Sequence, residues 1–256
     1  MNKKTRKLEL RVIPIAVRGE INPGDSVAES LIQALSGSRV SLKSGDILVV
    51  KHKIVSKAEG RFVELGSVRP KASLVTWARR YGLDARVTEV ALSQSRRIVR
   101  RKNGVLITET DHGLVCANSG VDVSNVDGGK HALLLPKDPD RSAAILHRKL
   151  KQRFGLAIPV IITDSFGRAW REGLTEVAIG VAGIKALRDF RGQRDPHGYP
   201  LRVSLEAVAD ELACAAGLVC GKLERTPACI IRGFQYQPGR GTARDLIRPA
   251  ANDLFR

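Results

Sequence analysis

The segment Ile158–Thr163 is a continuous apolar run of strand length, a pattern typical of a buried strand. Ile47–Val50 and Ala228–Arg232 have the same character, and the turn residues Lys43–Asp46 precede the first of them. Leu8–Val17 also reads as a strand. Strands outnumber helices in the first half of the chain, and their order is irregular. We therefore expect an α+β, mixed fold with mostly antiparallel sheets and packed helices rather than regular βαβ repetition.

Apolar residues recur at helical spacing in two segments, and a third segment reads as a helix from its end signal. Asp138 and Asp140 are candidate caps for the first helix, because short carboxylates accept hydrogen bonds from the free N–H groups of a first turn. The predicted helices are Ser142–Phe154, Val208–Val219 and Ala72–Tyr81, and the glycines expected to end them are Gly155, Gly221 and Gly82.

The composition excludes several classes of protein. No apolar run approaches the ~18 residues of a membrane-spanning helix, and no signal-peptide pattern follows the basic start. The four cysteines form no CxxC pair and show no zinc-like spacing with histidine, so we expect reduced thiols in a cytoplasmic protein that has no membrane partner.

The charge is +17, from 43 Lys+Arg against 26 Asp+Glu, and a surplus of this size attracts polyanions, nucleotides or acidic metabolites. Nucleic acid is disfavoured because the chain has only six Phe, three Tyr and two Trp for base stacking. The cations are also dispersed, with short clusters at Lys3–Lys7 and Arg96–Lys102. A nucleic-acid-binding protein therefore stays as an alternative supported by charge alone.

Two segments carry carboxylates beside small or polar residues. In His112–Val126, Asp122 and Asn125 are candidate oxygen ligands or amide donors, although the same residue types dominate ordinary Asx turns. In the second segment, Asp164 and Ser165 follow the apolar run and are placed to hold a divalent cation, while a helix cap is the alternative reading.

Basic residues accompany these candidates. Arg168 and Arg171 can clamp phosphate or carboxylate oxygens, or can be solvated surface arginines. Lys51–Arg61 reads as a loop on which several donors converge, as a triphosphate requires, although alone it also fits a solvated edge. No glycine-rich phosphate-binding motif is present, so a nucleotide site needs another construction.

Five segments together, in this order, resemble the coenzyme F420-0:L-glutamate ligase (γ-glutamyl ligase) family, with a match from about Pro14 to Phe234. They are GDILVVKHKIVSKAEGR (45–61), HGLVCANSGVDVSNV (112–126), LLLPKDPDRSA (133–143), ITDSFGRAWREGLTEVAIGVAGI (162–184) and AVADELACAAGLVCGK (207–222). The resemblance implies the F420 γ-glutamyl ligase-like fold. It also implies a basic N-terminal extension (1–13), a ligase domain (14–234) and a C-terminal tail (235–256), which we expect to be loosely held.

Members of this family use GTP and a divalent metal to join L-glutamate to the carboxylate of coenzyme F420-0, and further γ-linked glutamates can follow. The resemblance implies Mg²⁺ or Mn²⁺, two per site, with K⁺ as a further cation, and a homodimer. The implied metal ligands are Asp122, Asp164 and Ser165. The implied nucleotide-binding residues are Arg18, Gly19, Glu20, Ile21, His52, Lys53, Lys57, Asn125, Gly221, Lys222, Leu223, Glu224, Arg225 and Thr226.

The chemistry of amide formation agrees with this resemblance. A carboxylate is a poor electrophile, so transfer of the γ-phosphoryl group to give an acyl phosphate would activate it. Divalent ions and a cation would stabilise the charge of that transfer, and we assign the catalytic role to Lys57 with Arg168 or Arg171. The same chemistry on folate is the alternative within the family, because these motifs do not identify the acceptor.

Three segments depart from the family pattern, and one of them is Lys51-His52-Lys53, which is more basic than usual. The usual Gly-Leu/Ile-Pro near the start is Val17-Arg18-Gly19 here. Some relatives carry an acid where this chain has Lys222, and whether Glu224 substitutes for that acid is left open.

Overall fold

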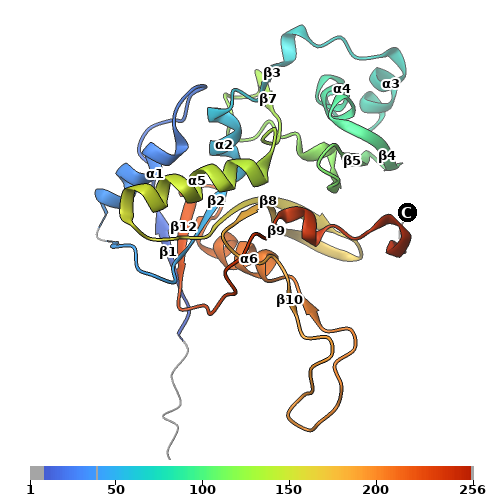
Figure 1. The fold of residues 1–256 in the computed structure, drawn as a ribbon. Helices are drawn as coiled ribbons and strands as arrows, with labels where there is room; N and C mark the ends of the chain where they lie inside the picture. Colours follow the sequence, from blue (N-terminus) through green and yellow to red (C-terminus); the bar gives the residue numbers. More distant parts are fainter. Residues whose placement is uncertain (1–8, 39, 255–256) are drawn as a thin grey trace, which may run out of the picture.

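The computed structural model describes residues 9–38 and 40–254, and it is built around a five-stranded sheet in the order β1-β12-β2-β8-β9 (Figure 1). The strands are β1 (Arg11–Ile15), β12 (Ala228–Arg232), β2 (Ile47–Lys51), β8 (Val160–Arg168) and β9 (Arg171–Ala182). Within the described residues β2 and β8 form a parallel pair, and the other three neighbouring pairs are antiparallel. The expected α+β class is confirmed.

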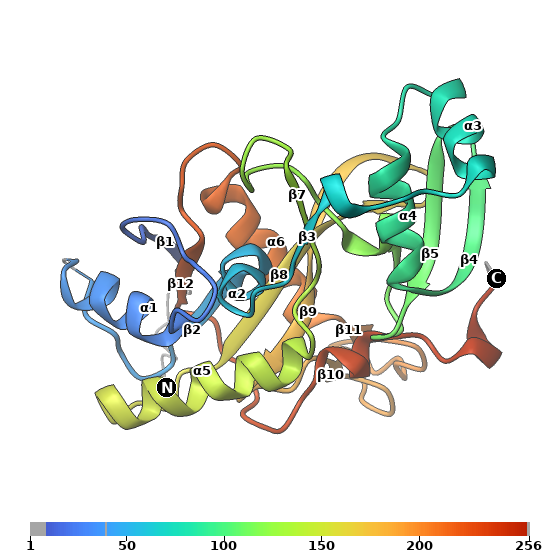
Figure 2. The same cartoon turned by 90° about the horizontal axis from the view of Figure 1, so that it is seen from above.

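Helices cover both faces of this sheet. α1 (Val27–Ser36) and α5 (Pro139–Phe154) pack on one face with Leu48 and Ile162, whereas α6 (Val208–Cys220) packs on the other with Ile47 and Ile161 (Figures 1 and 2). Because β2 and β8 are covered on both sides, every residue of the run Ile47–Val50 is buried. This double burial is why these strands read as continuous rather than alternating apolar runs.

A smaller lobe lies at one end of the molecule, opposite α1 (Figure 2). There α3 (Ala72–Arg80) and α4 (Ala85–Ser93) pack on a three-stranded sheet around a core that includes Leu65, Val90 and Leu106. An arm based on β10 (Arg188–Asp189) and β11 (Leu205–Glu206) projects from the opposite side of the central sheet (Figure 1). The remaining elements are α2 (His52–Ala58), β3 (Phe62–Glu64), η1 (Leu65–Ser67), β4 (Ser95–Lys102), β5 (Val105–Thr110), β6 (Val115–Ala117), η2 (Asn118–Gly120), β7 (His131–Leu133), η3 (Ala243–Leu246) and η4 (Ala250–Asn252).

The end signals of the longest helix act as the sequence predicts. The carboxylate of Asp138 is the N-cap of α5 and accepts a hydrogen bond from the backbone N–H of Arg141 at 3.0 Å. Gly155 ends the helix in the left-handed conformation, at φ 69°. Asp140 has a different role from the one expected, because its carboxylate accepts backbone N–H groups from outside the helix.

Two sequence expectations about local structure are wrong. The segment expected as a donor-rich loop after Val50 is largely helical, because α2 begins at His52 directly after β2. Asp164 and Ser165 do not lie where a strand ends, since β8 continues to Arg168 and forms a long hairpin with β9. Pairing with β9 extends this strand beyond its apolar part.

The segment after Gln235 is held against the sheet, so the expectation of a loosely held tail is wrong for residues 237–246. The carbonyl of Gln237 accepts a hydrogen bond from the backbone N–H of Lys185 at 3.0 Å, and Ala243 is only 4% exposed. At the other end of the chain, β1 crosses the expected boundary between the extension and the ligase domain, because it pairs with β12 from Arg11 onward.

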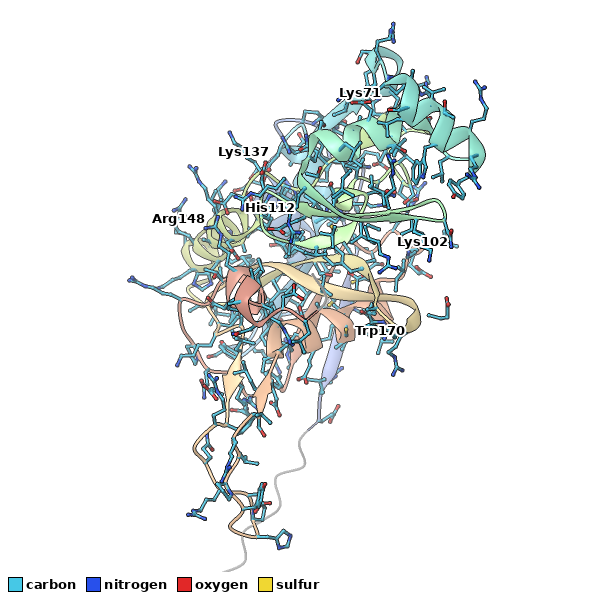
Figure 3. All side chains as sticks on the ribbon, turned by 90° about the vertical axis from the view of Figure 1, so that its right-hand side faces the viewer. Lys71, Lys102, His112, Lys137, Arg148 and Trp170 are labelled. Atoms are coloured by element: carbon cyan, nitrogen blue, oxygen red, sulfur yellow. The ribbon has the colours of Figure 1, made fainter. Side chains whose placement is uncertain are left out.

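The basic side chains are spread over the surface. Lys71, Lys102, Lys137 and Arg148 lie at separate places on the molecule (Figure 3). The cluster Lys3–Lys7 lies outside the described residues. None of the helices within residues 9–38 and 40–254 is long and apolar enough to cross a membrane.

Asp140 gives the fold a predicted pH dependence. Its Oδ1 accepts hydrogen bonds from the backbone N–H groups of Val181 and Ala243, both at 2.8 Å. Burial raises the pKa of Asp140, and these two donors only partly oppose it. The carboxylate of Asp140 therefore binds a proton more tightly in the native state than in the unfolded chain. The resulting stabilisation is fully present below pH ~3.9, the ordinary pKa of an aspartate, and is lost as the pH rises through the raised pKa.

We expect Asp140→Asn to remove this dependence. The free energy of unfolding of wild type should fall relative to that of the variant between about pH 3.5 and about pH 7. Urea unfolding of both proteins across that range measures the difference. A difference that is the same at every pH would contradict the assignment.

Candidate functional site

A cavity of about 940 Å³ opens where β2 ends at Lys51 and β8 passes Ser165. Loops from the N-terminal region, from the segment after Asp122 and from the end of α6 complete its wall. The predicted nucleotide-binding residues that line it are Gly19, Glu20, Ile21, His52, Lys53, Lys57, Asn125, Gly221, Lys222, Leu223, Arg225 and Thr226. Segments that are far apart in the sequence therefore meet here, as the resemblance implies.

Two predicted nucleotide-binding residues do not line the cavity. Arg18 is absent from its wall, whereas its neighbours Val17 and Gly19 contribute to it. Glu224 instead folds back on its own loop, where its Oε2 accepts the backbone N–H of Leu223 at 2.9 Å.

The two predicted catalytic arginines also lie apart from the cavity. Arg168 and Arg171 are exposed and flank the tip of the β8–β9 hairpin, and Arg168 donates to the carbonyl of Glu172 at 2.7 Å. Trp170, which is 81% exposed, marks this tip at the molecular surface (Figure 3). The structure thus brings Lys57 to the cavity but not the arginines assigned with it.

Asp122 is held beside the cavity by a short β-bridge. Its backbone N–H and C=O both pair with Leu133, at 3.1 and 2.8 Å. Its carboxylate accepts Lys53 Nζ at 2.7 Å and both the backbone N–H and the hydroxyl of Ser124. Burial alone would raise the pKa of Asp122, but the hydrogen bonds from Lys53 and Ser124 outweigh it and lower that pKa. The carboxylate is therefore charged and matched to a cation.

Asp164 is the second carboxylate, in the middle of β8. Its Oδ1 accepts the backbone N–H of Ser165 at 2.7 Å and lies 3.2 Å from Nε2 of His52. His52 is only 2% exposed, and its Nδ1 lies 3.2 Å from the hydroxyl of Ser56. The geometry of the Nε2 contact is not that of a well-aligned hydrogen bond, so we treat it as a close electrostatic contact. The ring of His52 thus lies against the carboxylate of Asp164.

The two carboxylates contact consecutive residues at the same helix end. His52 contacts Asp164 and the next residue, Lys53, pairs with Asp122, and both belong to the first turn of α2. Asp122, in a loop, and Asp164, in β8, are more than forty positions apart in the sequence, yet they contact two neighbouring side chains. Asp122 lines the cavity, whereas Asp164 does not line it but contacts His52, which does.

The donor set fits a metal that is shared with a ligand. Carboxylate and hydroxyl oxygens suit Mg²⁺ or Mn²⁺, and Mg²⁺ is commonly bound by one or two carboxylates plus substrate phosphates. Within the described residues no group of three or more His, Cys, Asp and Glu side chains converges to hold an ion by itself. Asp122 and Asp164 would therefore need phosphate oxygens to complete the coordination.

Sequence reasoning included Lys51 only among the donors of the segment Lys51–Arg61 and missed Glu176, and the two residues form a pair beside the cavity. Glu176 lies in β9 and is 8% exposed, and its carboxylate accepts hydrogen bonds from Lys51 Nζ, from the Thr163 hydroxyl and, at 2.6 Å, from the Ser165 hydroxyl. Burial alone would raise the pKa of Glu176, but these three donors together lower it. The one sequence signal was a carboxylate directly before the apolar stretch of β9.

Ser165 and Asp164 point in opposite directions, because successive residues of a strand face opposite sides of a sheet. Ser165 pairs across the ladder with Glu176, and Lys51 lies beside Thr163 in the parallel pair. The hydroxyl expected as a metal ligand therefore donates to Glu176, whereas Asp164 faces His52.

The loop after α6 borders the cavity on its remaining side. Gly221 ends the helix at φ 52°, a conformation that side chains rarely adopt, so glycine suits this abrupt change of direction. The loop contacts the Asp122 segment, since the side-chain amide of Asn125 donates to the carbonyl of Lys222 at 3.4 Å. On the N-terminal side, Lys57 pairs with Glu20 at 3.0 Å.

Comparison with known proteins agrees with this architecture. The model of the F420-0:gamma-glutamyl ligase family matches residues 17–233. The chain is 42% identical over 252 residues to the coenzyme F420:L-glutamate ligase of Methanopyrus kandleri, covering 96% of this chain and 98% of that protein. The corresponding enzyme of Methanothermobacter thermautotrophicus is 43% identical over 92% of this chain and 94% of its own length. That of Methanocaldococcus jannaschii is 40% identical over the full length of both. With a family match over most of its length, the chain belongs to the F420-0:gamma-glutamyl ligase family.

Proposed function

We propose that this protein is a GTP- and divalent-metal-dependent ligase that forms an amide bond between L-glutamate and the carboxylate of coenzyme F420-0. The observation that carries the proposal is a cavity of about 940 Å³ whose wall includes Asp122, paired with Lys53, and His52, in contact with Asp164. Family membership supports the choice of ligase chemistry, because the matched relatives are named coenzyme F420:L-glutamate ligases.

The reaction has two steps. A carboxylate oxygen of the acceptor attacks the γ-phosphorus of GTP, and the bond to the β,γ-bridging oxygen breaks with its electron pair leaving on GDP. The neutral amine of glutamate then attacks the acyl carbon, loses a proton to solvent, and the C–O bond breaks with its electron pair leaving on phosphate. One GTP is thereby converted to GDP and phosphate for each amide formed. A divalent ion would supply charge neutralisation between the converging anions.

The residues of the cavity suit anionic substrates. Lys53 and Lys57 line it together with Lys222 and Arg225 from the loop after α6. GTP, glutamate and a phosphate-bearing acceptor are all negatively charged, and fixed cations in a partly desolvated cavity orient such groups strongly. We assign Lys53 and Lys57 to the phosphates and Asp122 and Asp164 to the metal.

Further expectations accompany this proposal. All four cysteines are free thiols, which supports a cytoplasmic location. The homodimer stays a prediction that analytical ultracentrifugation would check.

The test is direct. The purified protein is incubated with GTP, L-glutamate, Mg²⁺ or Mn²⁺, and either F420-0 or a folate, and the products are weighed by mass spectrometry. We expect F420-0 to gain one or more glutamyl residues, with one GDP and one phosphate released per amide. EDTA should stop the reaction, and ATP should not replace GTP.

Several outcomes would overturn the proposal. Glutamyl folate as the product would keep the chemistry and replace the acceptor. Product formation without nucleotide consumption would exclude the acyl-phosphate route. No ligation with either acceptor, together with strongly salt-dependent binding of RNA or DNA, would favour the nucleic-acid alternative.

A further inference from the structure

The two arginines expected to stabilise the transferring phosphoryl group lie at the tip of the β8–β9 hairpin, and neither lines the cavity. A cation is still required there, because negative charge accumulates between the acceptor carboxylate and the phosphates. Lys51 does line the cavity, and its side chain is 18% exposed. It is therefore the candidate for this role, although sequence reasoning placed it only among the donors of the segment Lys51–Arg61 and assigned it no catalytic part.

Three consecutive residues place Lys51 at the reacting end of the site. Lys51 is followed by His52, which contacts Asp164, and by Lys53, which pairs with Asp122. In the parallel pair of β2 and β8, Lys51 lies beside Thr163, and its Nζ shares the carboxylate oxygen Oε1 of Glu176 with the hydroxyl of Ser165. Ser165 lines the cavity and is one of the residues that the family resemblance implies as metal ligands, so the ammonium group lies beside the Ser165 part of the proposed cation site.

Lys51 is held more rigidly than the other two paired lysines of the cavity. Its partner Glu176 is 8% exposed and is fixed by the hydroxyls of Thr163 and Ser165. By contrast, the partner of Lys57 is the 71% exposed Glu20, and the partner of Lys53 is the 39% exposed Asp122. A charge fixed in place before the reaction stabilises a transition state best, since no reorganisation is needed as charge develops.

The ammonium group also has donors available for a ligand. A lysine carries three N–H donors. Within the described residues the structure gives Lys51 Nζ one side-chain acceptor, Glu176 Oε1. The neutralising partner therefore positions the ammonium without using all its hydrogen-bonding capacity.

We propose that Lys51, positioned by Glu176, binds the γ-phosphoryl group of the nucleotide and stabilises it during transfer to the acceptor carboxylate. Lys51 is then a catalytic residue and Glu176 a positioning residue. The inference rests on the proposed function, since it requires a nucleotide whose γ-phosphoryl group is transferred.

Equilibrium binding of nucleotides tests the contact without turnover. In wild type, the affinities for GDP and for β,γ-imido-GTP are measured by titration calorimetry in the presence of Mg²⁺. We expect Lys51→Met to weaken binding of the imido analogue about 10-fold or more, as for a lost charge-assisted hydrogen bond, and to leave GDP binding within about 3-fold. Lys151→Met, an exposed lysine on α5, should change neither affinity.

Steady-state kinetics test the catalytic role. We expect Lys51→Met to lower kcat by about 10²–10³-fold with little change in the KM for glutamate, and Lys51→Arg to recover part of the loss. Glu176→Gln should lower kcat less than Lys51→Met does, because it releases the ammonium without removing it.

A double variant separates catalysis from folding. Lys51→Met alone leaves the carboxylate of Glu176 buried without its cation, whereas Lys51→Met/Glu176→Gln removes both charges. We expect the double variant to fold with a cooperative thermal transition and to remain as slow as Lys51→Met. A double variant as fast as wild type would assign the loss to the stranded Glu176 and overturn the inference.

Other results also decide the matter. Equal weakening of GDP and imido-GTP, or an unchanged kcat in Lys51→Met, would overturn the role of Lys51. Tighter binding of Mn²⁺ by Lys51→Met and weaker binding by Glu176→Gln, both without nucleotide, would make Glu176 a metal ligand instead. Failure of the proposed function can be told apart from failure of this inference. In the first case the wild-type protein itself would bind no guanine nucleotide or form no amide.

Discussion

Asp122→Asn and Asp164→Asn are each expected to lower the rate of metal-dependent ligation about a thousandfold or more. Each substitution replaces a charged oxygen ligand by a neutral amide, and metal stabilisation of a phosphoryl transfer is worth several kcal/mol. The two carboxylates contact consecutive residues of α2, and the proposed function assigns both to one metal site, so losing either should disrupt it. Initial rates over a range of Mn²⁺ concentrations measure the effect.

Asp111→Asn is the matched control for these variants. Asp111 is an exposed carboxylate paired with Arg96 at 3.3 Å, and it does not line the large cavity. Its rate should equal that of wild type. If both Asp122→Asn and Asp164→Asn ligated at near-normal rates with normal metal dependence, the assignment of these residues would be wrong.

Gly180→Ala is expected to destabilise the fold by about 3 kcal/mol or more, toward the upper end of overpacking effects. Gly180 lies in β9 where this strand packs against the start of α5. A Cβ atom there would lie 2.4 Å from the carbonyl oxygen of Pro139 and 2.5 Å from its carbonyl carbon. Both are backbone atoms, so relief requires the helix to move from the sheet. The melting temperature should fall by roughly 6–12 °C.

Gly66→Ala is the control for this prediction. A Cβ at Gly66 would meet only the side-chain oxygen of Glu64 at 3.7 Å, which is ordinary contact. Its free energy of unfolding should stay within about 0.5 kcal/mol of wild type. Equal melting temperatures for Gly180→Ala and wild type would show that α5 and β9 are not closely packed.

The parts of the fold that the sequence predicts are those where burial is uniform. Ile47–Val50, Ile158–Thr163 and Ala228–Arg232 were expected as strands, and all three contribute to the central sheet. The same pattern could not give the length of β8, because Asp164–Arg168 owe their extended conformation to pairing with β9 rather than to their own composition. α2 was missed for a related reason, since it spans only two turns of mixed polarity.

The sequence motifs predict which segments line the cavity. They do not predict which side chains are brought together by pairing between strands. The segments predicted to bind the nucleotide meet at one cavity, in agreement with the resemblance. The position of Arg168 and Arg171 depends on how far the β8–β9 hairpin extends, which no local pattern specifies. The pair of Lys51 and Glu176 joins residues 125 positions apart, so only the register of three strands reveals it.

The first turn of α2 has a mechanical consequence for the enzyme. His52 and Lys53 share one rigid stretch of backbone, yet each is attached to an acid from a different part of the chain. One peptide bond therefore links the contact to the Asp122 loop with the contact to β8. A backbone change in the first turn of α2, such as Lys53→Pro, should disturb both carboxylates at once.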